Sequence, residues 1–96
     1  MAVATFAAYA ATLANVTASE TSVTLQAANE NRRGWYCWND STSALFIKFG
    51  AVASSTSNTV KLASDSFYEM PEPVYTGVVD GIWTTANGAA RVTETT

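Results

Sequence analysis

Beyond about residue 20, short runs of alternating apolar and polar residues are separated by clusters of Asn, Ser, Gly and Pro. Alternation with a period of two places successive side chains on opposite faces, as a half-buried β-strand requires. The polar clusters between the runs are typical of turns. We therefore predict strands over residues 22–27, 34–39, 44–49, 59–62, 66–70, 75–79, 82–85 and 89–94.

Two of these segments make sharper predictions. In residues 44–49, Leu45, Ile47 and Phe49 alternate with Lys48 and predict the clearest core strand of the chain. In residues 34–39, both faces of the strand carry large apolar side chains, which predicts a strand covered on both sides.

Two dipeptides predict tight turns. Asp80-Gly81 separates residues 75–79 from residues 82–85, and this pattern favours a β-hairpin. Asn87-Gly88 is a second hairpin signal, just before residues 89–94.

Short strands at close spacing predict an all-β fold, either a single antiparallel β-sandwich of jelly-roll-like type or a small barrel of about 7–8 strands. Residues 1–19 are ambiguous, because apolar residues recur at helical spacing and Ala favours a helix, yet Val and Thr are scattered throughout. We expect an N-terminal arm or short helix over residues 1–19 and the sandwich over residues 20–96. Such an arm would be well placed to lie on a neighbouring subunit.

The composition limits the size of the core. A chain of 96 residues forms one domain, and although 48% of it is hydrophobic, 17 of those residues are alanine. A single core of this size supplies little net stability. We therefore expect a homo-oligomer, a trimer or a dimer, or a chain that docks onto a larger body.

The same composition narrows the possible chemistry. The chain has no His, one Cys and a net charge of −3, which disfavours acid–base catalysis by His, a zinc site and a nucleic-acid groove. Cys37 lacks a neighbouring base and is predicted to be a core residue. We expect no enzymatic activity, no metal and no cofactor. No segment has the basic start of a signal peptide or the length of a membrane helix.

One cluster combines basic and aromatic residues. Arg32 and Arg33 precede Trp35, and both Arg and Trp are enriched in protein interfaces. We expect one of the arginines to pair with an acidic group at a subunit contact. The candidate partner-interface residues are Phe6, Tyr9, Arg32, Arg33, Trp35 and Trp83.

Residues 21–94 contain an ordered series of short motifs. They include Ala28-Asn29-Glu30-Asn31-Arg32, Trp38-Asn39-Asp40-Ser41-Thr42, Phe46-Ile47-Lys48-Phe49-Gly50, Tyr68-Glu69-Met70-Pro71, Tyr75-Thr76-Gly77, Gly81-Ile82-Trp83 and Asn87-Gly88-Ala89-Ala90-Arg91-Val92. In their order and spacing they resemble small structural proteins and C-terminal modules of tailed-bacteriophage and prophage virions.

The resemblance implies a virion structural role. We expect a capsid decoration or cement protein that is made in the host bacterial cytoplasm and binds the outer face of the major capsid protein lattice. A neck, tail or fibre-base adaptor, with other virion proteins as partners, is the second hypothesis. A third is a carbohydrate-binding sandwich that stacks Trp35, Trp38 or Trp83 on sugar rings.

Overall fold

The computed structural model describes residues 7–96, and these residues form an all-β fold without a helix. No helix capable of crossing a membrane therefore occurs among them. The strands are β1 (Ala11–Thr17), β2 (Val23–Gln26), β3 (Gly34–Asp40), β4 (Leu45–Phe49), β5 (Val60–Leu62), β6 (Phe67–Glu69), β7 (Val79–Trp83) and β8 (Ala89–Thr95).

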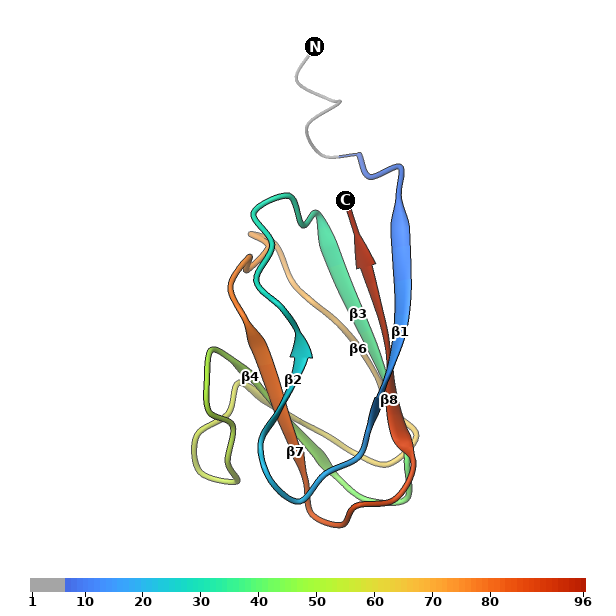
Figure 1. Cartoon of the computed structure of the whole chain (residues 1–96), viewed down its shortest axis with the longest axis vertical. Coiled ribbons are helices and arrows are strands. Elements are labelled where there is room, and N and C mark those ends of the chain that lie inside the picture. The colour runs from blue at the N-terminus through green and yellow to red at the C-terminus, as the bar shows by residue number, and fades with distance from the viewer. Residues whose placement is uncertain (1–6) are drawn as a thin grey trace.

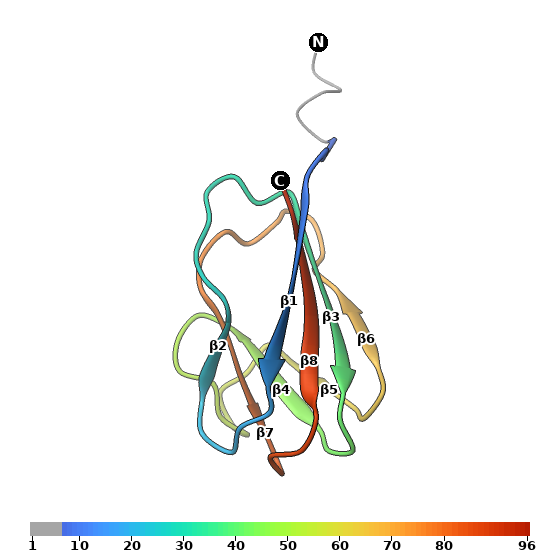
Figure 2. The same cartoon turned by 45° about the vertical axis from the view of Figure 1, so that its right-hand side comes forward.

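The strands form two four-stranded antiparallel sheets that pack face to face (Figures 1 and 2). The first sheet has the order β1-β8-β3-β6, and the second has the order β2-β7-β4-β5. The predicted sandwich is thus confirmed. The small-barrel alternative is wrong, because the two sheets do not close into one barrel.

Strand pairing is nested along the chain. The first strand pairs with the eighth, the second with the seventh, the third with the sixth and the fourth with the fifth. Two further pairings, β3 with β8 and β4 with β7, join these four pairs into the two sheets. The chain therefore crosses repeatedly between the sheets, and almost every strand contact is between residues far apart in sequence.

The Ala-rich N-terminal segment contains a strand rather than a helix. β1 pairs with β8 in an unbroken register from Ala11 opposite Thr95 to Thr17 opposite Ala89. The backbone groups of this segment are thus satisfied by a neighbouring strand, which outweighs the weak helix propensity of alanine. For the described part of residues 1–19, the helix alternative is wrong.

The predicted hairpin at Asp80-Gly81 is also wrong, because both residues lie inside β7. The Asp80 carboxylate accepts hydrogen bonds from the hydroxyls of Ser22 and Thr24. A Cβ on Gly81 would come within 2.7 Å of Leu25, so glycine here permits close packing. The dipeptide favours a turn locally, but the contacts of β2 hold it extended.

Asn87-Gly88 does lie in the connection between β7 and β8, which bends at Gly88, and the φ of 78° at Gly88 suits glycine. Because β7 and β8 lie in different sheets, this connection is a crossover and not the predicted hairpin.

The core lies between the sheets and includes Trp35, Leu45, Ile47 and Trp83, all at most 2% exposed. Phe49 packs against this core, which confirms the inward face predicted for residues 44–49. Only one face of β3 is buried, however. The prediction that β3 is covered on both sides is wrong for residues 7–96, because none of their strands packs over the outer face of the first sheet.

Candidate functional site

The candidate interface residues separate into buried and exposed groups. Trp35, Trp83 and Arg32 are buried inside the chain, so their side chains support the fold and are not offered to a partner. Tyr9 and Arg33 are exposed and lie near one another at one end of the molecule. Phe6 lies outside the described residues.

Arg32 ties two loops to the first sheet. Its Nε donates to the carboxylate of Glu94, on β8, at 2.9 Å, and the two side chains form an ion pair. Its remaining nitrogens donate to the carbonyls of Tyr75, Gly77 and Ala27. The expected arginine–carboxylate pair therefore forms, but it forms within the chain and not at a subunit contact.

The two buried indoles are held by side-chain amides. Trp35 Nε1 donates to Oε1 of Gln26 at 3.0 Å, and Trp83 Nε1 donates to Oδ1 of Asn39 at 3.1 Å. Both rings face the core. In this structure neither ring can stack on a sugar, which leaves Trp38 as the partly exposed indole of the described chain.

Cys37 is a buried core residue, as predicted. Burial raises the pKa of its thiol from 9.0 to about 12, because the low-dielectric interior disfavours the thiolate. Since the thiolate is the nucleophile, this environment makes Cys37 inert at neutral pH.

Several of the acidic side chains have structural partners. Asp40 pairs with Arg91, Asp65 accepts from the Trp38 indole, and Glu20 accepts from the backbone of Ala86. Among residues 7–96, no group of three or more potential ligands converges on a metal position.

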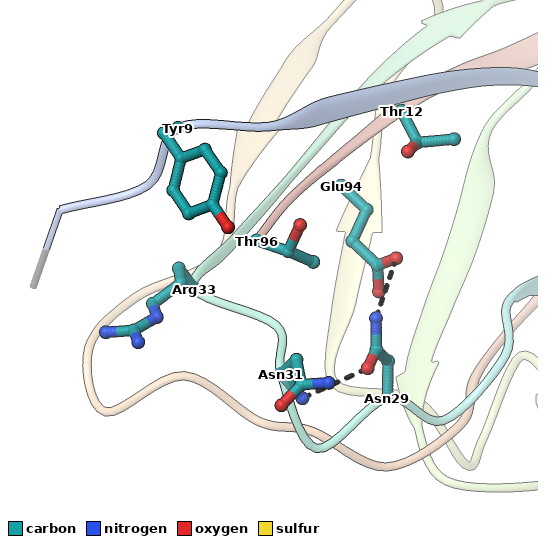
Figure 3. A pocket seen from close by; sticks show the side chains of 7 residues that line it. All are labelled: Tyr9, Thr12, Asn29, Asn31, Arg33, Glu94 and Thr96. Atoms are coloured by element: carbon teal, nitrogen blue, oxygen red, sulfur yellow. Dashed lines mark hydrogen bonds between the residues drawn. The ribbon is translucent and has the colours of Figure 1, made fainter. Parts of the chain in front are cut away.

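A polar hollow of about 490 Å³ opens beside the N-terminal end of β1 (Figure 3). Glu94 lies at its inner wall, where its carboxylate also accepts from Nδ2 of Asn29. Asn29 forms an Asx turn in which the N–H of Asn31 donates to Oδ1 of Asn29. The hollow is lined by Tyr9, Thr12, Asn29, Asn31, Arg33, Glu94 and Thr96. It is hydrophilic and holds no nucleophile paired with a base.

The outer face of the first sheet is the more distinctive surface. The strand registers place Trp38 opposite Phe67 and next to Arg91. Trp38 is 40% exposed and Phe67 is 64% exposed, while the rings of Tyr36 and Phe67 stack 6.3 Å apart. We call Tyr36, Trp38 and Phe67 the aromatic face. Exposed apolar clusters of this kind mark interaction sites.

The aromatic face continues toward the edge strand β1. Leu13 lies opposite Thr93, which in turn lies opposite Tyr36, so these three residues share the outer side of the sheet. Leu13 is 75% exposed. Three charged residues border this face: Arg91 and Asp40 neutralise one another in an ion pair, and Glu69 lies opposite Tyr36 at the β6 edge.

Sequence reasoning missed the aromatic face, although the alternation within residues 34–39 already separated Tyr36 and Trp38 from Trp35 and Cys37. What it could not show was which of these two faces remains open. The edge strand β1 was missed as well, because its sequence carries no strong strand pattern.

Comparisons of the chain with protein-family models, with curated proteins and with solved structures found no match.

Proposed function

We propose that this protein is a virion structural component of a tailed bacteriophage, a capsid decoration or cement protein that docks on the assembled major capsid protein through its aromatic face. The observation that carries the docking surface is the grouping of Trp38, Phe67 and Leu13 on one exposed side of one sheet. The resemblance of the sequence motifs to virion proteins supplies the setting.

The nested strand order also supports this proposal. An eight-stranded sandwich in which strands pair one with eight, two with seven, three with six and four with five is the arrangement of a jelly roll, a fold used by capsid proteins and lectins. We propose that the fold is a jelly roll on this basis. Fold alone does not assign function, so the proposed docking rests on the aromatic face and not on the fold.

Stabilisation of the shell would follow from mass action. A protein that binds the assembled state and not its separated subunits shifts the equilibrium by RT ln(1 + [L]/Kd) at each site. The rigid sheet presents its aromatic side chains in fixed positions, so little conformational freedom is lost on docking.

The test compares two substitutions with equal exposure. Phe67 is 64% exposed on the aromatic face, and Val52 is 63% exposed in the loop between β4 and β5. Phage particles that lack this protein are incubated with the wild type, Phe67→Ser or Val52→Ser, and the bound copies are counted by quantitative gel. We expect Phe67→Ser to weaken binding by about 10-fold or more, because an aromatic anchor commonly contributes more than 1–2 kcal/mol. Val52→Ser should bind as the wild type does.

Bound wild-type protein should also raise the resistance of the particles to heat and osmotic shock. The proposal fails if depleted particles are as resistant as complete ones, or if both substitutions weaken binding equally. Saturation at about six or twelve copies per particle would instead favour a neck or tail adaptor. Quenching of tryptophan fluorescence by bacterial surface glycans, lost in Trp38→Ala, would favour carbohydrate binding.

A further inference from the structure

The free edge of β1 is a pairing surface without the usual protection. β1 is the outermost strand of the first sheet, and its seven residues contain no charge and no proline. Its register with β8 has no bulge. Natural edge strands are commonly protected by Lys, Pro, bulges or shortness, as the three-residue strands β5 and β6 at other edges of the sandwich are. β1 has none of these features.

The hydrogen bonds at the two ends of the β1–β8 ladder show which backbone groups point outward. Thr96 N donates to Ala10 O, and Ala18 N donates to Gly88 O. Hydrogen-bonded pairs alternate along an antiparallel ladder, so the even-numbered residues of β1 bond to β8. The outward N–H and C=O groups therefore belong to Ala11, Leu13, Asn15 and Thr17.

We propose that β1 pairs antiparallel with β1 of a second copy of this chain, about a two-fold axis beside Ala14. The four outward residues are spaced symmetrically about Ala14, so this register matches Ala11 with Thr17 of the second copy and Leu13 with Asn15. Each pair exchanges two backbone hydrogen bonds, which leaves none of the outward groups of β1 unpaired.

Side chains and charge suit a second copy. At the axis the two Ala14 residues face one another in a non-hydrogen-bonded pair, where side chains are closest and small ones fit. Residues 11–15 are exposed on both faces, so no element of the sandwich overhangs the approach. Since β1 is uncharged, self-pairing opposes no like charges, despite the net charge of −3.

The charges near the two ends of β1 favour the antiparallel direction. Arg33 lies at the N-terminal end, where it lines the hollow with Tyr9, and Glu20 follows the C-terminal end. Antiparallel pairing brings the Arg33 end of one copy to the Glu20 end of the other. Parallel pairing would bring like charges together.

The dimer would contain one continuous eight-stranded sheet. Because a two-fold axis of an antiparallel sheet runs perpendicular to the sheet, both aromatic faces point to the same side. In the setting of the proposed function, two faces on one rigid body give bivalent attachment, in which the second contact forms at high effective concentration. The pairing itself does not depend on that function.

The test measures mass and backbone amide exchange together. We expect sedimentation at increasing concentration to show a mass that rises from 10.2 kDa to twice that value. In the same range, amide exchange at Leu13, Asn15 and Thr17 should slow at least 10-fold, whereas Ala14 and Val16, bonded to β8, should be protected throughout.

Asn15→Pro should abolish the dimer and leave the fold intact, because it removes an outward N–H without touching the β1–β8 ladder. Phe67→Ser, on the aromatic face, should dimerise as the wild type does while its particle binding weakens, so this pair of variants separates the dimer from the proposed function. A monomer at all concentrations overturns the inference, as does a dimer whose outward amides still exchange freely. Outward amides protected even in a dilute monomer would assign the edge to residues 1–6 and also overturn it.

Discussion

The two arginine–carboxylate pairs within residues 7–96 offer a direct test of how burial determines the contribution of an ion pair to stability. Arg32 with Glu94 and Arg91 with Asp40 each have a closest contact of 2.9 Å. The side chains of the first pair are 0% and 10% exposed, whereas those of the second are 44% and 38% exposed. Substitution of either arginine by Met removes the charge and keeps much of the aliphatic bulk.

The expected losses differ because the groups left behind differ. Arg32→Met leaves the Glu94 carboxylate with Asn29 as its remaining donor and removes the guanidinium donor from three loop carbonyls. Removing one partner of a buried pair costs about 3–5 kcal/mol of unfolding free energy. In Arg91→Met, water solvates Asp40, so the loss should be about 0–1 kcal/mol.

The assay is urea unfolding followed by tryptophan fluorescence at one fixed protein concentration, with the free energy taken by linear extrapolation. Since 1 kcal/mol shifts the Tm of a domain of this size by roughly 4–8 °C, Arg32→Met should lower the Tm by about 12 °C or more. Arg32→Lys retains the charge but not the fork of donors, and its loss should fall between those of the two Met variants. Equal losses for Arg32→Met and Arg91→Met would show that burial does not determine the strength of these ion pairs.

Two further predictions concern the core. Asn39→Asp should lower the free energy of unfolding by about 3 kcal/mol or more, because Nδ2 of Asn39 donates to three backbone carbonyls that a carboxylate would repel. The matched change Asn58→Asp, at an exposed loop amide, should lower it by less than about 0.5 kcal/mol. Similar urea midpoints for the two variants would contradict this prediction. The free energy of unfolding should also fall as pH rises from 9 to 12. Burial raises the pKa of the Cys37 thiol to about 12 and raises the pKa of Tyr68, so the folded state holds these protons more tightly than the unfolded state does. The resulting stabilisation is fully present below the pKa values of the unfolded state and is lost as pH rises through those of the folded state. Urea midpoints across this range, with Cys37→Ala showing a smaller fall, check the prediction, and a folded thiol that reacts rapidly with a disulfide reagent at pH 8 would contradict it.

Local patterns were most reliable where burial and alternation agree. In β4 the alternation of Leu45, Ile47 and Phe49 with Lys48 predicts both the strand and its buried face. The turn at Asn29 is local in the same way, because its side chain accepts a hydrogen bond from the backbone only two residues away. Such features depend on neighbours in the sequence, and tertiary contacts do not reverse them.

Local patterns failed where a distant contact decides the outcome. Asp80-Gly81 has the composition of a turn, yet the hydroxyls of Ser22 and Thr24 donate to Asp80 and Leu25 packs on Gly81. The Ala-rich stretch around Leu13 has no decisive propensity, and pairing with β8, about 80 residues away in the register, makes it a strand.

The candidate surfaces show the same division. The sequence placed Arg32, Trp35 and Trp83 among the candidate interface residues, but each is buried and hydrogen-bonded within the chain. The residues left exposed are Trp38 and Phe67, which are 29 positions apart and become neighbours only through the pairing of β3 with β6.

The amino-acid sequence alone predicts an all-β fold of short strands with a small core, a buried unreactive thiol and no histidine chemistry, because composition and two-residue alternation act locally. The tertiary structure was needed to distinguish a sandwich from a barrel and to show which face of β3 stays open, which arginine is buried and which strand lies at a free edge. Those outcomes depend on the order of strands in the two sheets, and that order is set by hydrogen bonding and packing between segments far apart along the chain.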